Sequence, residues 1–207
     1  LITFCEPRPE HKDLTITERS KIKARQGVEL ISSGEVRVVH EDGTEVPKDG
    51  QTLGEITVRG NVVMSGYYND PEETNAAIKN NWFHTGDAAV VHPDGFLEIR
   101  DRFKDVIISG GENISSVELE GCLLEHPSVQ EVAVVGMPHE KWGESPHAFV
   151  VLKDHANVTD DVLKLHVRER LAHFKVPQLI TFIDDLPKTA TGKVQKYVLR
   201  DRKYSIT

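Results

Sequence analysis

The sequence predicts an α+β protein in two parts. Residues 1–103 are expected to form a small β-rich subdomain, the end of a larger domain, because short alternating segments with Asp-Gly turns fill most of them. Residues 104–207 are expected to form a compact α+β domain with a three-stranded sheet and helices, because apolar runs there alternate with segments at helical spacing. With 207 residues and 38% hydrophobic content, the chain can build one large domain or two modest ones.

The first part begins with polar and charged residues, within which TERSKIKARQGVE is weakly helical. Three short strands are expected next, in GEVRVV, GEITVRG and GFLEIRDR, with turns in HEDGTEVPKDG and HPDGF. One helix interrupts them in NDPEETNAAIKNN. Asp70 can cap this helix, Pro71 suits its first position, and Glu73 lies at its third.

The second part follows the charged, glycine-free stretch Arg100–Asp105. DVIISG is expected to be a strand, and SSVELEGCLLEHP a helix with a capping box of Ser115 and Glu118. VQEVAVVGM and HAFVVLK predict two more strands. TDDVLKLHVRERLAHF predicts an amphipathic helix that Pro177 ends, and LITFID predicts the last strand.

Charge and cysteine content exclude several classes of protein. The formal net charge is −8, and an acidic chain without a basic face is a poor candidate for binding nucleic acid. Cys5 and Cys122 are far apart and outside any C-x-x-C pattern, which fits a reducing compartment and argues against a disulfide scaffold. The longest apolar runs are too short to span a bilayer.

No metal site or serine nucleophile is expected. The ten histidines are scattered, and pairs such as His139/His147 and His166/His173 lack compact metal-ligand spacing. GESP around Ser145 is not a G-x-S-x-G elbow.

The stretch LPKTATGKVQK, residues 186–196, contains a Thr/Gly-rich turn. A Walker A loop requires G-x-x-x-x-G-K-[ST], but Pro187 takes the first glycine position and Val194 follows Lys193. The turn therefore presents Lys193 as a point charge that an anionic ligand can approach. A solvated turn is the alternative interpretation.

The stretch WFHTGD combines two aromatic residues, a turn glycine and Asp87 at a strand edge. A carboxylate can accept hydrogen bonds from two adjacent sugar hydroxyls, which makes Asp87 a candidate ribose ligand. An ordinary Asx turn explains the stretch equally well.

A third stretch, DRFKDVIISGGENISSVELE, carries a candidate ligand and a glycine pair. Arg102 is a forked donor suited to hydroxyls or phosphate. Gly110 and Gly111 permit the close approach of a ligand or unusual backbone angles. A hairpin turn leading into a capped helix is compatible with both interpretations.

Each motif alone is weak, but together their order and spacing are specific. GEITVRGNVVMSGYYNDPEET, WFHTGD, DGFLEIRDRFKDVIISGGENIS and LPKTATGKVQK closely resemble the C-terminal part of the adenylate-forming acyl-CoA synthetases. The resemblance covers nearly the whole chain and looks closest to the short- and medium-chain acyl-activating enzymes of plants and bacteria. It implies a two-step reaction: a carboxylate attacks the α-phosphate of ATP, and the CoA thiol then attacks the resulting acyl-adenylate.

The resemblance implies roles for individual residues. Asp87 and Arg102 resemble the residues that bind the ribose of ATP or AMP. Lys193 resembles the catalytic lysine that reaches the α-phosphate and the carboxylate during adenylation. Lys104 falls at the hinge about which the small domain is expected to rotate between the two half-reactions.

The glycine pair belongs to the second half-reaction by the same resemblance. Gly110 and Gly111 lie on the segment that replaces Lys193 at the active site, beside the tunnel for the pantetheine arm of CoA. Glu112 and Asn113 belong to the same turn.

The resemblance also implies that these 207 residues cannot complete the reaction alone. The ATP-phosphate loop, a Tyr-Gly-x-Thr-Glu stretch, the acyl pocket and the glutamate that holds Mg²⁺ would lie on a missing N-terminal domain. The expected partners are ATP, CoA, a fatty or related short- or medium-chain acid, and that domain. No metal ligand is expected in this chain.

Two alternatives remain open. The chain can be a non-catalytic ligand-binding or interaction module, or part of an adenylate-forming enzyme that loads a carrier-protein thiol. Free CoA is preferred as the acceptor, because no carrier attachment motif follows Lys193. The C-terminal residues KYSIT are not a peroxisomal S-K-L signal and LITFCEPRPE is not a targeting sequence, so the cytosol is the default expectation.

Overall fold

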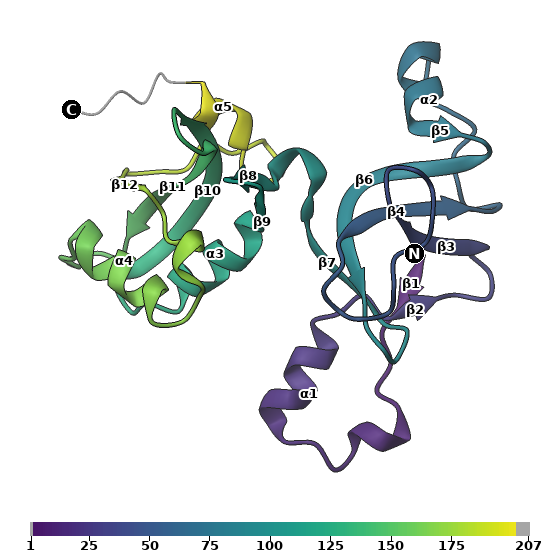
Figure 1. The fold of residues 1–207 in the computed structure, drawn as a ribbon, viewed down its shortest axis with the longest axis horizontal. Coiled ribbons are helices and arrows are strands. Elements are labelled where there is room, and N and C mark those ends of the chain that lie inside the picture. Colours follow the sequence, from purple (N-terminus) through teal and green to yellow (C-terminus); the bar gives the residue numbers. More distant parts are fainter. Residues whose placement is uncertain (1, 202–207) are drawn as a thin grey trace. The chain divides into compact units, whose positions relative to one another are not determined.

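The computed structural model describes residues 2–201 and divides the chain into two compact units. The first unit ends at Lys104 and the second begins at Asp105. Figure 1 shows a sheet with helices in each unit. The KYSIT sequence lies outside the described residues.

The first unit is built around an antiparallel five-stranded sheet. Its strands are β3 (Glu35–Val39), β4 (Gly54–Arg59), β5 (Ile78–Lys79), β6 (Trp82–Val91) and β7 (Leu97–Arg102). The order is β3-β4-β6-β5, with β7 also paired to β6 (Figure 1). The long strand β6 therefore has three partners, and it carries the WFHTGD stretch. The sheet buries Val38, Val46, Ile56, Val58, Ala89, Val91 and Leu97.

Short helices and one further strand pair complete the first unit. The capping predicted for Asp70 is confirmed, because its Oδ1 accepts a hydrogen bond from the Glu73 N–H at 2.9 Å. Thr15 and Glu18 form a reciprocal capping box that begins the helix in TERSKIK. These elements are β1 (Thr3–Phe4), η1 (Pro9–His11), α1 (Ile16–Lys23), β2 (Val28–Glu29) and α2 (Pro71–Ala77).

The second unit has a five-stranded sheet, where three strands were expected. Its strands are β8 (Ile107–Ser109), β9 (Glu112–Ile114), β10 (Val129–His139), β11 (Gly143–Leu152) and β12 (Leu179–Phe182). The three strands β10, β11 and β12 form its main part, with β12 parallel to β11. The other two strands form the short β8–β9 hairpin, which joins β11 through a Ser109–Gly143 pairing. The strand β8 was expected in DVIISG, whereas β9 was not.

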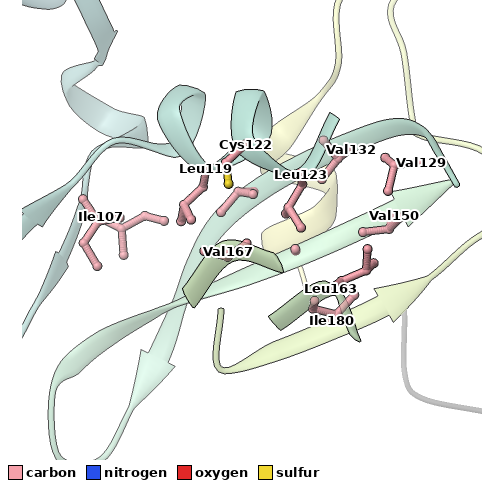
Figure 2. Close-up of a cluster of buried hydrophobic side chains, with 13 residues drawn as sticks. Ile107, Leu119, Cys122, Leu123, Val129, Val132, Val150, Leu163, Val167 and Ile180 are labelled. Atoms are coloured by element: carbon pink, nitrogen blue, oxygen red, sulfur yellow. The ribbon is translucent and has the colours of Figure 1, made fainter. Parts of the chain in front are cut away.

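Both faces of this sheet are covered. Consecutive residues of β10 and β11 point to opposite sides, and each side packs into its own apolar cluster. One cluster contains Val132, Val134 and Val150, together with side chains from the helices α3 (Ser116–Leu124) and α4 (Asp160–Arg168) (Figure 2). The other cluster contains Ala133, Val135, Phe149, Val151, Leu186 and Leu199, the last from α5 (Lys196–Arg200). Burial on both faces explains the uninterrupted apolar run VAVV.

The helix expected in TDDVLKLHVRERLAHF is shorter than predicted. α4 ends at Arg168, and a separate turn, η3 (His173–Lys175), follows it. A helix that runs on to Phe174 is excluded by Ala172, whose extended backbone (ψ 144°) cannot continue a helix. The helix is amphipathic as predicted, because Leu163 and Val167 face the core, and Leu171 packs against the same core.

Candidate functional site

Asp87 and Arg102, the two candidate ribose ligands, lie opposite each other in the pairing of β6 with β7. The Nε atom of Arg102 is 2.8 Å from Oδ1 of Asp87. The Asp87 side chain is 26% exposed and that of Arg102 is 57% exposed, so a ligand can reach both. Two residues that are 15 positions apart in sequence are thus brought into contact by strand register.

A bulge in β6 lies beside this pair. Between its pairings Thr57–His84 and Glu55–Ala88, the chain advances four residues along β6 but two along β4, so β6 has two extra residues. One of the residues in the bulge is Gly86, whose φ of 71° lies in the left-handed region that glycine tolerates best. Bulges of this kind change the direction of a side chain and are frequent next to active sites.

Lys104 lies at the boundary between the units, in the 3₁₀ turn η2 (Phe103–Asp105). The next residue, Asp105, is anchored in the second unit, because its Oδ1 accepts a hydrogen bond from Arg200 at 2.5 Å. The Asp105 side chain is only 12% exposed. A change of backbone direction between the units would therefore fall on the Lys104 side of this anchor.

Gly110 and Gly111 form the two-residue turn of the β8–β9 hairpin, between Ser109 and Glu112. Both have positive φ, 60° and 89°, as a type I′ turn requires. The Gly110 N–H donates to the carbonyl of Trp142 at 2.9 Å, and a Cβ at Gly110 would lie 2.9 Å from the Trp142 ring. A Cβ at Gly111 would meet no atom within 4 Å. The turn requires both glycines, but only Gly110 is also required by a neighbouring side chain.

Lys193 lies in a small hairpin that backbone hydrogen bonds close. The Thr189 N–H donates to the Lys193 carbonyl at 2.8 Å, and the Lys193 N–H donates to Oγ1 of Thr189 at 3.1 Å. Gly192, with φ of 83°, makes the turn. The side chain of Lys193 is exposed to solvent, while its backbone is held by the two hydrogen bonds with Thr189.

The three lysines of LPKTATGKVQK differ in their ion pairs. Lys188 Nζ is 2.6 Å from Glu131 Oε2, and Lys196 Nζ is 2.8 Å from Glu120 Oε1. Among residues 2–201, no carboxylate lies within ion-pair distance of the Lys193 ammonium group. Lys188 and Lys196 are therefore paired within the unit, and the Lys193 ammonium group is available for a ligand.

Residues 118–193 match the sequence family described as the AMP-binding enzyme C-terminal domain. The chain carries an AMP-binding enzyme C-terminal domain. Its sequence and its α+β fold are those of the C-terminal part of the adenylate-forming acyl-CoA synthetase family, as the sequence motifs predicted.

Among curated relatives of this chain, the probable acyl-activating enzyme 6 of Arabidopsis thaliana is 48% identical over 204 residues, which cover 97% of the chain and 37% of that protein. The 2-methylpropanoate–CoA ligase CCL4 of Humulus lupulus is 48% identical, with the same two coverages. The chain thus spans a little over a third of the length of the relatives it matches.

Solved structures of similar fold include a CoA synthetase and an amide bond synthetase. The o-succinylbenzoate CoA synthetase of Bacillus subtilis, solved with an acyl-adenylate, has a TM-score of 0.80 and 36% identity, over 94% of this chain and 38% of that one. The amide bond synthetase of Marinactinospora thermotolerans also has a TM-score of 0.80, with 35% identity over 89% of this chain and 37% of that one.

The AMP-binding C-terminal domain also contains a pocket that sequence reasoning missed. The pocket has a volume of about 280 Å³ and lies beside the glycine turn. Gly110, Trp142 and Phe174 are among its lining residues, and both aromatic rings are partly exposed. The signal in the sequence was weak, because Trp142 lies 32 residues after Gly110 and only the pairing of β11 with β8 brings them together.

The described part of the chain contains no second candidate for a catalytic or metal site. Burial raises the pKa of the Cys122 thiol, which makes it a poor nucleophile. Residues 2–201 contain no cluster of three His, Cys, Asp or Glu side chains that could hold a metal ion. None of the helices in these residues is long and apolar enough to cross a membrane.

Proposed function

We propose that this chain is the C-terminal portion of an ATP-dependent carboxylic acid–CoA ligase. The complete enzyme converts a carboxylate, ATP and CoA into acyl-CoA, AMP and pyrophosphate through an acyl-adenylate. The acid is a fatty or related short- or medium-chain acid, and a relative named as a 2-methylpropanoate–CoA ligase supports this class.

The observation that carries the proposal is the available charge of Lys193. As a carboxylate attacks the α-phosphate of ATP, negative charge builds on the α-phosphate oxygens and on the pyrophosphate that leaves, and a positioned cation lowers the free energy of that transition state. Lys193 can donate to these oxygens without first breaking an ion pair, whereas Lys188 and Lys196 cannot.

Asp87 and Arg102 are proposed to hold the nucleotide. The Asp87 carboxylate accepts hydrogen bonds from the ribose hydroxyls, and the Arg102 guanidinium orients that carboxylate and contacts the ribose itself. Their spacing of 2.8 Å supports a joint role. Mg²⁺ is proposed to be held by a glutamate of the ATP-binding portion, outside these residues.

Gly110 and Gly111 are proposed to serve the thioester step. The turn that they form lets the pantetheine arm of CoA pass close to the backbone, and the pocket beside Trp142 and Phe174 is available to the rest of the acceptor. Rotation about Lys104 exchanges Lys193 for this turn between the two half-reactions.

Two other acceptors compete with CoA. The similarity to an amide bond synthetase favours an amine as a second candidate, and a carrier-protein thiol is a third. The experiment uses a polypeptide that joins these residues to the ATP-binding portion and measures acid-dependent exchange of pyrophosphate into ATP. CoA, an amine and a pantetheinylated carrier are then added in parallel, and acyl transfer to CoA at the highest rate is the expected result.

The 207-residue chain alone is expected to form no acyl-CoA from acid, ATP and CoA. Measurable product from the purified chain would refute this. A cytosolic location is the default proposal, although two relatives are named as peroxisomal, and fractionation of the source cells tests it.

A further inference from the structure

The carboxylate of Glu55, on β4, contacts Gly86 in the bulge of β6 and His84 at the edge of that bulge. Its Oε1 accepts a hydrogen bond from the Gly86 N–H at 2.9 Å. Its Oε2 lies 2.6 Å from Nδ1 of His84. Both side chains are 26% exposed, so the contact is largely shielded from water. One side chain therefore restrains two of the three residues that precede Asp87.

The residue between them is restrained by the same strand. Oγ1 of Thr85 donates to the Ile56 carbonyl at 2.9 Å and accepts a hydrogen bond from the Asp87 N–H at 3.1 Å. Every residue of the bulge before Asp87 is thus fixed to β4, either by Glu55 or by the backbone next to it.

The bulge explains why the Gly86 N–H needs a side chain as its hydrogen-bond acceptor. Two extra residues in β6 interrupt its regular pairing with β4. An unpaired N–H in such a place lowers stability unless another acceptor is present, and an ionised carboxylate is a stronger acceptor than a carbonyl. Glu55 provides that acceptor for Gly86, whose left-handed conformation sets the direction of the next residue, Asp87.

We propose that Glu55 is a positioning residue for the nucleotide: it fixes residues 84–86 of β6, which lead into Asp87, so that Asp87 faces the ribose opposite Arg102. This inference rests on the proposed function of Asp87 as a ribose ligand. Glu55 itself touches no substrate, and its effect is transmitted through one backbone N–H and one imidazole.

A purely structural role for Glu55 and a positioning role predict different effects of its removal. The sheet is already held by buried apolar side chains, among them the neighbouring Ile56 and Val58. A structural glutamate would lower stability without changing which nucleotide is preferred. A positioning glutamate changes the discrimination between ATP and 2′-deoxy-ATP, because that discrimination depends on where the Asp87 carboxylate lies.

The test compares variants in the polypeptide that includes the ATP-binding portion, with ATP and 2′-deoxy-ATP as substrates for adenylation. Glu55→Ala is expected to raise KM for ATP about tenfold, the equivalent of one lost charge-assisted hydrogen bond, and to reduce the preference for ATP with a smaller change in kcat. Glu55→Gln retains an oxygen that can accept from Gly86 and is expected to restore most of the preference. Glu35→Ala is the matched control, because Glu35 forms an ion pair with Arg37 on the same sheet but does not touch the bulge.

Asp87→Ala separates the inference from the function on which it rests. The positioning role is supported if Asp87→Ala abolishes the preference for ATP, Glu55→Ala alone reduces that preference, and the double variant behaves like Asp87→Ala. If Asp87→Ala abolishes the preference but Glu55→Ala leaves it unchanged, the role of Glu55 is wrong and the ribose assignment stands. If Asp87→Ala leaves the preference unchanged, the ribose assignment and the inference are both overturned.

Discussion

Asp87 and Arg102 face each other across two antiparallel strands, with the arginine Nε 2.8 Å from the aspartate Oδ1. The Arg102 side chain is more than half exposed, so this ion pair contributes little to stability, at most about 1 kcal/mol. Strand register places the two side chains together. A nucleotide can therefore bind Asp87 and Arg102 in place of part of their ion pair with little loss of stability.

Arg102→Ala is expected to raise KM for ATP in the adenylation step by about tenfold, because it removes a charged donor from the ribose site. Arg102→Lys is expected to recover only part of this loss, since an ammonium group lacks the fixed fork of a guanidinium. Steady-state kinetics of pyrophosphate exchange measure both effects. An unchanged KM for ATP in Arg102→Ala would contradict the assignment.

Lys104→Pro is expected to block the thioester step and spare adenylation, because proline fixes φ where rotation of the domain is proposed to occur. Lys104→Ala is the control that removes the side chain but keeps the backbone free. The two half-reactions are measured separately, as pyrophosphate exchange and as acyl transfer from a pre-formed adenylate. Unchanged overall turnover in the proline variant would show that Lys104 is not the pivot.

The glycine turn allows a matched comparison. Gly110→Ala and Gly111→Ala both place a side chain in the left-handed region, at a similar conformational cost of about 1 kcal/mol. Only the Cβ at Gly110 would also collide with the Trp142 ring. Gly110→Ala is therefore expected to slow acyl transfer to CoA more than Gly111→Ala, while pyrophosphate exchange stays near the unsubstituted rate. Equal effects would exclude the Trp142 contact as the cause.

His147 predicts a pH dependence of stability. Burial lowers its pKa from the ordinary value of 6.5, and its Nε2 lies 2.8 Å from Oγ1 of Thr181. The folded state thus favours the neutral ring, so its stability is retained above pH 6.5 and is lost as the pH falls below that value. His147→Gln keeps a polar group but removes the titration.

Urea unfolding of this chain at pH 7.5 and at pH 5.5 measures the contribution of His147. The free energy of unfolding should fall on acidification, and it should fall less in His147→Gln. Burial also lowers the pKa of His126, so some pH dependence remains in the variant. An identical decrease in both proteins would contradict the role of His147.

The sequence predicted those features that depend on local pattern. Asp70 caps α2, Ser115 caps α3 through the Glu118 N–H, and the paired glycines form a tight turn. Local hydrogen bonds and backbone preferences determine each of these, so a few adjacent residues are sufficient to predict them.

Features that depend on pairing between distant strands were not predictable. The attachment of the β8–β9 hairpin to the main sheet, and the contact of Trp142 with Gly110, follow from the pairing of β8 with β11. The role of Glu55 depends on a bulge between β4 and β6, and no local sequence signal indicates which residues a bulge displaces.

The lysines of LPKTATGKVQK show the same limit. Motif resemblance selected Lys193, but only the structure shows that Lys188 and Lys196 are already paired with Glu131 and Glu120. These partners lie 57 and 76 residues away in sequence, too far for any local pattern to reveal.

The central claim is that Lys193 serves adenylation alone, and Lys193→Ala in the polypeptide that includes the ATP-binding portion tests it most directly. Pyrophosphate exchange is compared with acyl transfer from a pre-formed adenylate to CoA, and Lys188→Ala, a lysine of the same hairpin, is the control. Lys193→Ala is expected to reduce pyrophosphate exchange by about 100-fold or more, the effect of losing one transition-state donor, and to leave acyl transfer within about twofold of the unsubstituted rate. Equal loss of both half-reactions, or normal exchange, would contradict it.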